Sequence, residues 1–371
     1  MKILFICGSI EPSKDGVGDY TRRLCGELIK MGHHAQILSL FDKQALKFSN
    51  QNQLTEENVV LAYRIPKNTT YNQRLNITKE IIEKEKPDLI SLQYVPFSFH
   101  NKGVPFWLPF FLKQINHEIK WHVMFHEMWT GISVISPFKH KVYGFFQRQI
   151  ARKIISNLNP ISITTSNILY QLVLEKNGIS TEILPLFSNI PKVKVDDEFK
   201  KIFFENLKIH ENNADNYLFT GVFGSIYPEA NLEIVLNELI IKAQSVNKKI
   251  VFISFGRNNN EGEKKIKSLK NKFSETIQFF NYGILSENNI SNLLQLLNIG
   301  ISCTPYQHLG KSGVFAAMKL HNLEVLMSCN EEIPEYKYKE KMEDFINRTP
   351  EMWSAEYVAR NFISIINKNN N

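Results

Sequence analysis

The sequence has 371 residues, 43% hydrophobic and 22% charged, which fits a soluble globular protein long enough for two domains. The net charge of +7 favours anionic partners. However, no dense run of Lys and Arg interleaved with aromatic residues appears, which argues against nucleic acid. The four cysteines form no C-x-x-C motif, so we expect small buried thiols and a cytoplasmic location.

The first half alternates short apolar runs with helical patterns. A helix is predicted over Tyr20–Met31, with Asp19 as its N-cap, and another over Leu75–Lys84. Continuous apolar strands joined by helices indicate a parallel sheet covered on both faces. The predicted strands are Ile3–Cys7, Ala35–Leu40, Val59–Tyr63, Asp88–Leu92, Trp121–Phe125, Ile161–Thr165 and Glu182–Leu186.

The second half repeats the alternation after a charged linker at Lys192–Lys201. Its predicted strands are Leu218–Phe223, Ile250–Phe255, Ile277–Tyr282, Ile299–Cys303 and Leu323–Met327. Its predicted helices are Leu232–Ala243, Glu263–Lys272, Ile290–Leu297, Val314–Leu320 and a last amphipathic helix, Glu351–Ile366. The sequence therefore predicts an α/β protein with two Rossmann-like, doubly wound domains, residues 1–190 and 191–350.

Ligands of open parallel sheets bind at the carboxyl ends of the strands, so loops that follow strands are the candidates for a site. In the loop Gly8–Tyr20, Gly16 and Gly18 allow close backbone approach, and the helix start favours anionic groups. The spacing is not that of a dinucleotide-binding G-x-G-x-x-G motif. His126 ends a strand and can donate a hydrogen bond or move a proton near neutral pH. A plain capped turn and a structural histidine are the alternatives.

The strongest signal lies after the strand Ile299–Cys303. There, Lys311 and Ser312 stand between Gly310 and Gly313, and the helix that starts at Val314 follows. Its amides, the ammonium group and the hydroxyl could form a diphosphate cradle. The motif is not a Walker A sequence, because a proline occupies the position of the first glycine. A solvated lysine before an ordinary helix is the alternative.

Two further loops of the second half follow strands. Gly224 and Ser225 come after its first strand and leave room for a ligand. Arg257 comes after its second strand and could pair with a phosphate through two hydrogen bonds. Plain turns are again the alternative.

The segment Gly103–Leu112 is unusually aromatic, and Arg148, Arg152 and Lys153 follow it in a helix. An exposed apolar patch beside basic residues could touch a membrane surface or a lipid-linked acceptor. Burial of the same residues in a core is the alternative.

Several of these segments resemble the retaining, family-four glycosyltransferases of GT-B type, and the resemblance covers nearly the whole chain. It rests on G-V-G-D-Y-T-R-R-L (Gly16–Leu24), K-P-D-L-I (Lys86–Ile90), F-N-Y-G-I-L-S (Phe280–Ser286) and the segment Thr304–Val325. It implies two domains facing a cleft, with a nucleoside-diphosphate sugar on the second and a saccharide or lipid-linked saccharide acceptor on the first. The last helix, 351–367, would pack back onto the first domain.

The resemblance also implies residue roles. Gly16, Gly18 and Asp19 would lie near the donor phosphates and the acceptor, and His126 near the transferred sugar. Lys311 and Arg257 would neutralise the departing diphosphate, which gives His126, Asp19 and Lys311 catalytic roles. The remaining donor-binding residues would be Gly224, Ser225, Tyr282, Gly310, Ser312, Gly313 and Val314. Neither a metal nor a cofactor is expected.

One departure from the family pattern leaves other functions open. Members commonly carry two glutamates eight positions apart, but here the positions are His308 or Leu309 and Ala316 or Ala317. The expected function is transfer of a hexose, with retained configuration, in surface polysaccharide or glycoconjugate synthesis. The alternatives are a sugar-nucleotide epimerase on the same scaffold and a catalytically silent partner protein, because fold alone does not decide function.

Overall fold

The computed structural model describes residues 1–12, 14–55, 58–115, 119–133, 136–329 and 338–369. They form an α/β protein of two compact units, each with its own sheet of wholly or mainly parallel strands, as the sequence predicts. The first unit is Met1–Pro185 with two later segments, Ile333–Met342 and Ala355–Asn371. The second is Leu186–Glu332 with Glu343–Ser354. The division thus falls after Pro185, whereas the sequence predicts it after residue 190.

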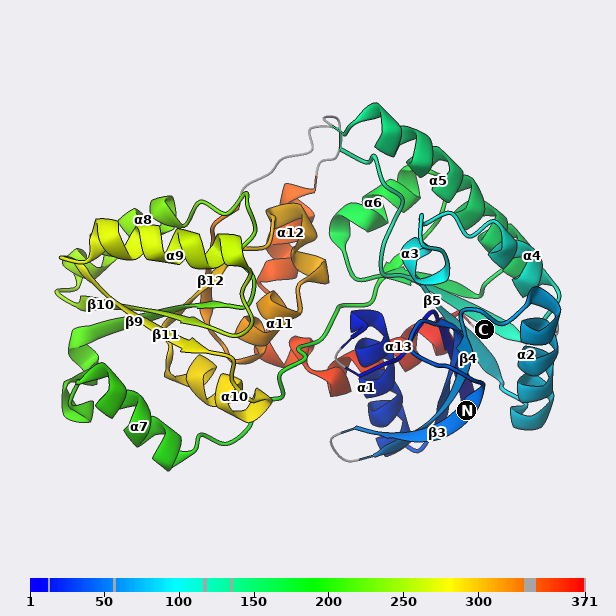
Figure 1. Ribbon diagram of the computed structural model, residues 1–371, viewed down its shortest axis with the longest axis horizontal. Coiled ribbons are helices and arrows are strands. Elements are labelled where there is room, and N and C mark those ends of the chain that lie inside the picture. The colour runs from blue at the N-terminus through cyan, green and yellow to red at the C-terminus, as the bar shows by residue number, and fades with distance from the viewer. Residues whose placement is uncertain (13, 56–57, 116–118, 134–135, 330–337, 370–371) are drawn as a thin grey trace. The chain divides into compact units, whose positions relative to one another are not determined.

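In the described part of the first unit, eight strands form one sheet in the order β3-β4-β2-β1-β5-β6-β7-β8 (Figure 1). The chain therefore moves outward from β1 in one direction and then restarts on its other side at β5. The strands are β1 (Lys2–Cys7), β2 (His34–Asp42), β3 (Ser49–Leu54), β4 (Val59–Pro66), β5 (Leu89–Tyr94), β6 (Lys120–Phe125), β7 (Ser162–Thr165) and β8 (Glu182–Ile183).

The edge strand β3, which pairs antiparallel with β4, is absent from the predicted strands. Its sequence, Ser-Asn-Gln-Asn-Gln-Leu, has no apolar run. An edge strand pairs with a neighbouring strand on one side only, so it can carry polar side chains. The helices of this unit are α1 (Gly16–Lys30), α2 (Tyr71–Glu85), α3 (Pro96–Phe99), α4 (Trp107–Lys113), α5 (Phe138–Leu158), α6 (Ile168–Lys176) and α13 (Ala355–Lys368).

The expected N-cap of the first helix was wrong. Helix α1 begins at Gly16, and Asp15 caps it by accepting hydrogen bonds from the amides of Val17 (3.1 Å) and Gly18 (2.9 Å). Asp19 therefore lies in the first turn, and so do Gly16 and Gly18. Asp at the N-cap satisfies amides that have no partner within the helix, and either aspartate fitted that rule from sequence alone.

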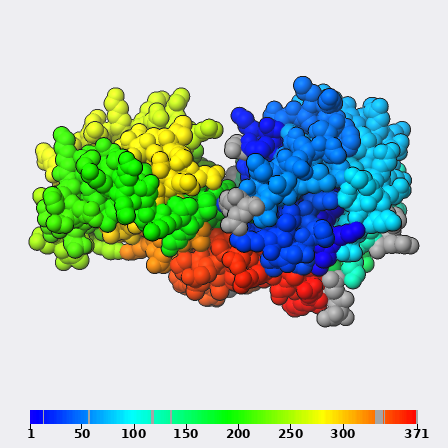
Figure 2. Space-filling model, turned by 90° about the horizontal axis from the view of Figure 1, so that it is seen from below, coloured from blue at the N-terminus to red at the C-terminus, as the bar shows by residue number. Residues whose placement is uncertain are grey.

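The C-terminal helix α13 packs on the first unit, against α1. Figure 2 shows its red surface beside the blue N-terminal part of the chain. Phe362 of α13 reaches the sheet, where its ring centre lies 5.7 Å from that of Phe5 and 5.1 Å from that of His122. Burial of one face of an amphipathic helix on the sheet explains why α13 belongs to this unit.

The second unit has a five-stranded parallel sheet among its described residues, in the order β11-β10-β9-β12-β13. Helices α8 and α9 lie on one side and α7 and α10 on the other (Figure 1). The strands are β9 (Tyr217–Phe223), β10 (Lys249–Phe255), β11 (Ile277–Gly283), β12 (Ile299–Ser302) and β13 (Glu324–Met327). The α-helices are α7 (Asp197–Leu207), α8 (Leu232–Ser245), α9 (Asn260–Phe273), α10 (Glu287–Leu296) and α11 (Gly313–Leu320), and α12 (Lys339–Ile346) contributes to both units.

Candidate functional site

In the first unit, the loop after β1 approaches the start of α1 so closely that only glycine fits at position 18. A side-chain carbon there would lie 2.7 Å from the carbonyl oxygen of Ser9 and 2.8 Å from Cα of Ile10. At Gly16, by contrast, nothing lies within 4 Å of such a carbon. Asp19 forms an ion pair with Arg22 at 2.5 Å. Ser13 of this loop lies outside the described residues.

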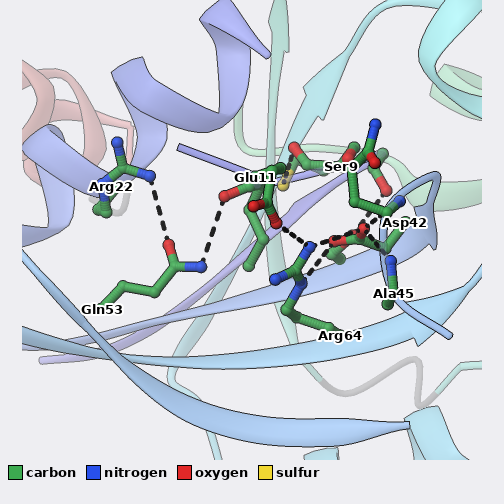
Figure 3. Close-up of polar contacts among 12 residues, drawn as sticks. Ser9, Glu11, Arg22, Asp42, Ala45, Gln53 and Arg64 are labelled. Atoms are coloured by element: carbon green, nitrogen blue, oxygen red, sulfur yellow. Dashed lines mark hydrogen bonds and ion pairs between the residues drawn. The ribbon is translucent and has the colours of Figure 1, made fainter. Parts of the chain in front are cut away.

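A buried ion cluster fastens the same loop to the sheet (Figure 3). Arg64 on β4 binds Asp42 through two hydrogen bonds of 2.9 Å and binds Glu11 of the loop at 2.6 Å. Asp42 is fully buried and also accepts from the amides of Gln44 and Ala45. Burial by itself raises the pKa of Asp42, but these partners outweigh burial and hold it below its usual value.

His126 directly follows β6 and belongs to a chain of buried hydrogen bonds. Its Nε2 lies 2.8 Å from Oε1 of Gln93, which donates through Nε2 to Ser91 at 2.7 Å. Ser91 contacts Nδ1 of His122 at 2.8 Å, and the other ring nitrogen lies 2.9 Å from Thr164. Each group in the row can pair one donor with one acceptor, so the chain fixes the orientation of the His126 ring.

The first turn of α1 and His126 come together. The ring of Tyr20 meets the ring of His126 edge to face, with 5.0 Å between their centres. A side-chain carbon at Gly8 would lie 2.5 Å from Cβ of Ser98, just after β5. These residues follow β1, β5 and β6, and the strand order reverses between β1 and β5. The structure therefore gathers the site residues predicted for this unit at its topological switch point.

The second unit shows the same arrangement at the carboxyl ends of β9 and β12, where its strand order reverses. A side-chain carbon at Gly224, after β9, would lie 3.4 Å from Cγ2 of Val314 in the first turn of α11. The loops predicted from two distant parts of the sequence are therefore in contact.

Glycines end three neighbouring strands of this sheet. Gly224, Gly256 and Gly283 follow or end β9, β10 and β11, and their φ angles of +78°, +85° and +62° lie in the left-handed region. Backbone hydrogen bonds join the row, from the Gly224 amide to Phe255 (2.9 Å) and from the Gly256 amide to the Gly283 carbonyl (2.7 Å). The row keeps the backbone bare of side chains at this edge of the sheet.

The cradle predicted around Lys311 begins with a capped helix. Ser312 is the N-cap of α11, and its hydroxyl accepts from the amide of Phe315 (3.1 Å) and contacts the Thr304 hydroxyl (2.8 Å). Lys311 directly precedes it and lies near His308. Burial, and then the charge of Lys311, lower the pKa of His308 to about 4, so this ring is neutral at pH 7.

The structure places three other predicted residues in three different surroundings. Arg257 is exposed just after β10, and its carbonyl oxygen lies 3.5 Å from the Ser225 hydroxyl. Gly313 faces Asn189, since a carbon built on it would lie 3.3 Å from that amide nitrogen. Tyr282 instead packs into the core, where its ring stacks on Phe203 with centres 6.2 Å apart. The structure therefore brings the loops together but packs the Tyr282 ring against α7, on one face of the sheet.

Three residues of the site are not among those predicted from the sequence: Gln93, Asp15 and Asn258. Gln93 is a polar residue near the end of the apolar strand β5, which pairs with β6 just before His126, and that position is the available signal. Asn258 accepts from the amides of Ile226 (3.3 Å) and Asn259 (2.9 Å) and so ties the loop after β10 to the loop after β9. Nothing in its local sequence distinguishes it from other loop asparagines.

A hollow of about 1030 Å³ lies at the opposite, amino edge of the first sheet. Its lining includes Met1, Lys86, Asp88 and Lys120, at the starts of β1, β5 and β6. None of the predicted site residues is among its lining. Because ligands of parallel sheets bind at the carboxyl edge, we do not assign this hollow to the site.

The fold matches that of known sugar-transferring proteins, although no family model and no curated protein matches the sequence. It is similar to HepE of Anabaena in complex with UDP and glucose, with a TM-score of 0.51 and 14% identity. That match covers 100% of this chain and 97% of the other. The catalytic domain of starch synthase IV of Arabidopsis thaliana, bound to ADP and acarbose, matches at 0.52 with 9% identity and 100% and 99% coverage.

A glycosyltransferase from Rickettsia africae matches at a TM-score of 0.50 with 15% identity, over 99% of this chain and 93% of that one. These likenesses over almost the whole chain show that the protein has the GT-B fold, as the sequence resemblance predicts.

Proposed function

We propose that the protein is a glycosyltransferase that moves a sugar from a nucleoside-diphosphate sugar to a hydroxyl group of a saccharide or lipid-linked saccharide. The observation that carries the proposal is the meeting of the loops after β9 and β12, where Gly224 approaches Val314 beside Lys311 and Ser312. The nucleotides in the HepE and starch synthase structures support it.

The chemistry requires that the negative charge on the departing diphosphate be stabilised. The Lys311 ammonium group, the Ser312 hydroxyl and the amides at the start of α11 would supply fixed positive charge and donors for that oxygen-rich group. The neutral ring of His308 offers a hydrogen bond without adding charge. In the first unit, His126 would orient the transferred sugar, because Gln93 holds its ring. Asp19 would act near the donor phosphates and the acceptor.

We further propose that the reaction retains configuration and needs no metal. Ala316 and Ala317, both buried in α11, are the candidates for the second position of the family's glutamate pair, so no carboxylate stands there. Lys311 and Ser312 would hold the donor instead of that carboxylate. The buried thiols Cys7, Cys25, Cys303 and Cys329 fit a reducing, cytoplasmic setting, and we propose a role in surface polysaccharide or glycoconjugate synthesis.

Thermal unfolding with a panel of nucleoside diphosphates and their sugar conjugates tests the donor site, with magnesium or with EDTA. A ligand at about 100 times its dissociation constant adds roughly 2.7 kcal/mol of stability. We expect one base to stabilise the protein equally in magnesium and EDTA. No stabilisation by any nucleotide would favour the silent-partner alternative, and conversion of the sugar nucleotide without an acceptor would favour an epimerase.

A further inference from the structure

Helix α5 carries a second apolar face that points away from the protein. Its buried face, which includes Gly144, Ile150 and Ile154, packs on the first unit. Four exposed residues lie on the opposite face: Phe138, Val142, Phe145 and Phe146, with exposed fractions of 81%, 40%, 49% and 43%. Their spacing of four, three and one residues places them in one stripe along the helix.

The preceding helix extends this stripe. Phe106 and Phe110 are 54% and 59% exposed, and the Phe106 ring meets the Phe146 ring edge to face at 6.0 Å. The Asn157 side chain donates to the carbonyl of Pro109 at 2.8 Å and so fastens α4 to α5. We call these six residues the aromatic patch: Phe106, Phe110, Phe138, Val142, Phe145 and Phe146. Clustered exposed aromatic side chains mark an interaction surface.

The charge around the aromatic patch has a single sign. At 100° per residue, Lys141, Arg148 and Arg152 lie on one side of the α5 stripe and Lys139 lies on the other. Lys153 lies in line with the stripe, beyond Phe146. The helix contains no acidic residue at all. Across residues 96–174 the sequence has eight Lys and Arg but only two Glu. The patch is thus an apolar ridge bordered by cations and by no acidic residue of the helix.

We propose that the aromatic patch docks on a membrane surface that carries anionic lipid. Aromatic side chains at the level of the headgroups, flanked by Lys and Arg that pair with lipid phosphates, are the chemistry that such a surface recognises. A second copy of the chain fits less well, because a twofold contact would set five cations of one helix against five of the other. No helix within the described ranges is long and apolar enough to cross a bilayer, so the contact is peripheral.

Helix α5, which carries most of the aromatic patch, contacts the loop that begins at His126. A side-chain carbon at Gly144 of α5 would collide with the carbonyl oxygen of Thr130. The amide and hydroxyl of Thr130 bind Gln147 (2.8 Å) and the carbonyl of His140 (3.0 Å). A lipid-linked acceptor held at the membrane would therefore lie near this loop. That last step rests on the proposed function, whereas the docking itself does not.

Flotation of the full-length protein with vesicles tests the docking. We expect binding to an equimolar mixture of phosphatidylcholine and phosphatidylglycerol that is at least about tenfold stronger than binding to phosphatidylcholine alone, and that weakens as salt rises. Phe138→Ser with Phe145→Ser should lower binding by about tenfold or more, and so should Lys141→Glu with Lys153→Glu.

The matched controls lie in the second unit. Ile241→Ser removes an apolar side chain that is 69% exposed on α8, and Lys267→Glu with Lys270→Glu reverses two exposed charges on α9. Both should bind vesicles like the unaltered protein. Equal binding to neutral vesicles, or unchanged binding of the patch variants, would overturn the proposal. A dimer in sedimentation velocity that the Phe variants dissolve would assign the patch to a second copy instead. Nucleotide binding is measured separately, so failure here leaves the proposed function standing.

Discussion

The carbonyl oxygen of Ser9 lies where a side chain of residue 18 would have to be, only 2.7 Å from an ideal Cβ on Gly18. Both partners are backbone, so neither can turn aside as a flexible side chain could. The contact holds the loop after β1 against the first turn of α1, next to His126. Substituting alanine for Gly18 and, separately, for Gly16 in this turn therefore separates the effect of close packing from that of helix propensity.

Gly18→Ala should destabilise the protein by about 2 kcal/mol or more, because the added methyl group overlaps fixed backbone atoms. Gly16→Ala is the matched control, since its methyl group meets nothing within 4 Å and alanine favours the helix. We expect that variant to be unchanged or up to about 1 kcal/mol more stable. Urea unfolding of both proteins decides the matter. Equal midpoints would mean that the loop is not packed as described.

The Arg64 cluster predicts a large difference between its two carboxylates. Arg64→Met would leave Asp42 fully buried without its cation, which should cost about 3–5 kcal/mol. Glu11→Gln should cost less than about 1 kcal/mol, because the Glu11 side chain is 36% exposed and water screens its charge. Chemical denaturation measures both changes. A Glu11 variant as unstable as the Arg64 variant would show that the loop, and not Asp42, depends on this arginine.

The architecture could be predicted because buried parallel strands are continuous apolar runs. Ile250–Phe255 and Leu218–Phe223 were assigned to within a residue of β10 and β9 for this reason. The polar edge strand β3 was missed because its pairing with β4 leaves no apolar pattern. Asp19 was mistaken for the cap because two aspartates precede the apolar face of α1, and only the three-dimensional hydrogen bonds of Asp15 distinguish them.

The candidate site was predicted in part. Loops at the ends of strands could be named, since the rule about carboxyl ends needs only the strand positions. The contact between Gly224 and Val314 could not be predicted, because it depends on β9 and β12 being neighbours. Gln93 and His122 were missed for a similar reason. Their hydrogen bonds run across three strands. The sequence of one strand does not indicate which side chains of a neighbouring strand lie beside it.

Lys311→Ala should lower turnover by about tenfold or more at saturating donor, since a cation that stabilises the leaving diphosphate is worth a few kcal/mol. Lys267→Ala removes the same charge from an exposed position of α9 that is not part of the candidate site, and it should leave turnover unchanged. Release of nucleoside diphosphate in the presence of acceptor measures both. If Lys311→Ala turned over like Lys267→Ala, Lys311 would have no role in the reaction.

His122 predicts how stability depends on pH. The ring is fully buried between Ser91 and Thr164, and burial, followed by the proximity of His126, lowers its pKa to about 3. The unfolded chain, with an ordinary pKa of 6.5, therefore binds a proton between about pH 6.5 and pH 3 that the folded protein does not bind. The stabilisation is fully present above about pH 6.5 and is lost as the pH falls toward 3, by up to about 1.4 kcal/mol for each pH unit.

Replacing the ring removes this dependence while keeping a polar group in the chain. His122→Gln should be less stable than the unaltered protein at pH 7, by about 1–3 kcal/mol, because two buried partners lose their hydrogen bonds. Its stability should then fall less steeply between about pH 6.5 and pH 5, so that the two proteins converge in acid. Urea unfolding at several pH values measures the convergence. Parallel curves would mean that His122 takes up its proton in the folded protein as readily as in the unfolded chain, which a ring buried between two hydroxyl groups should not do.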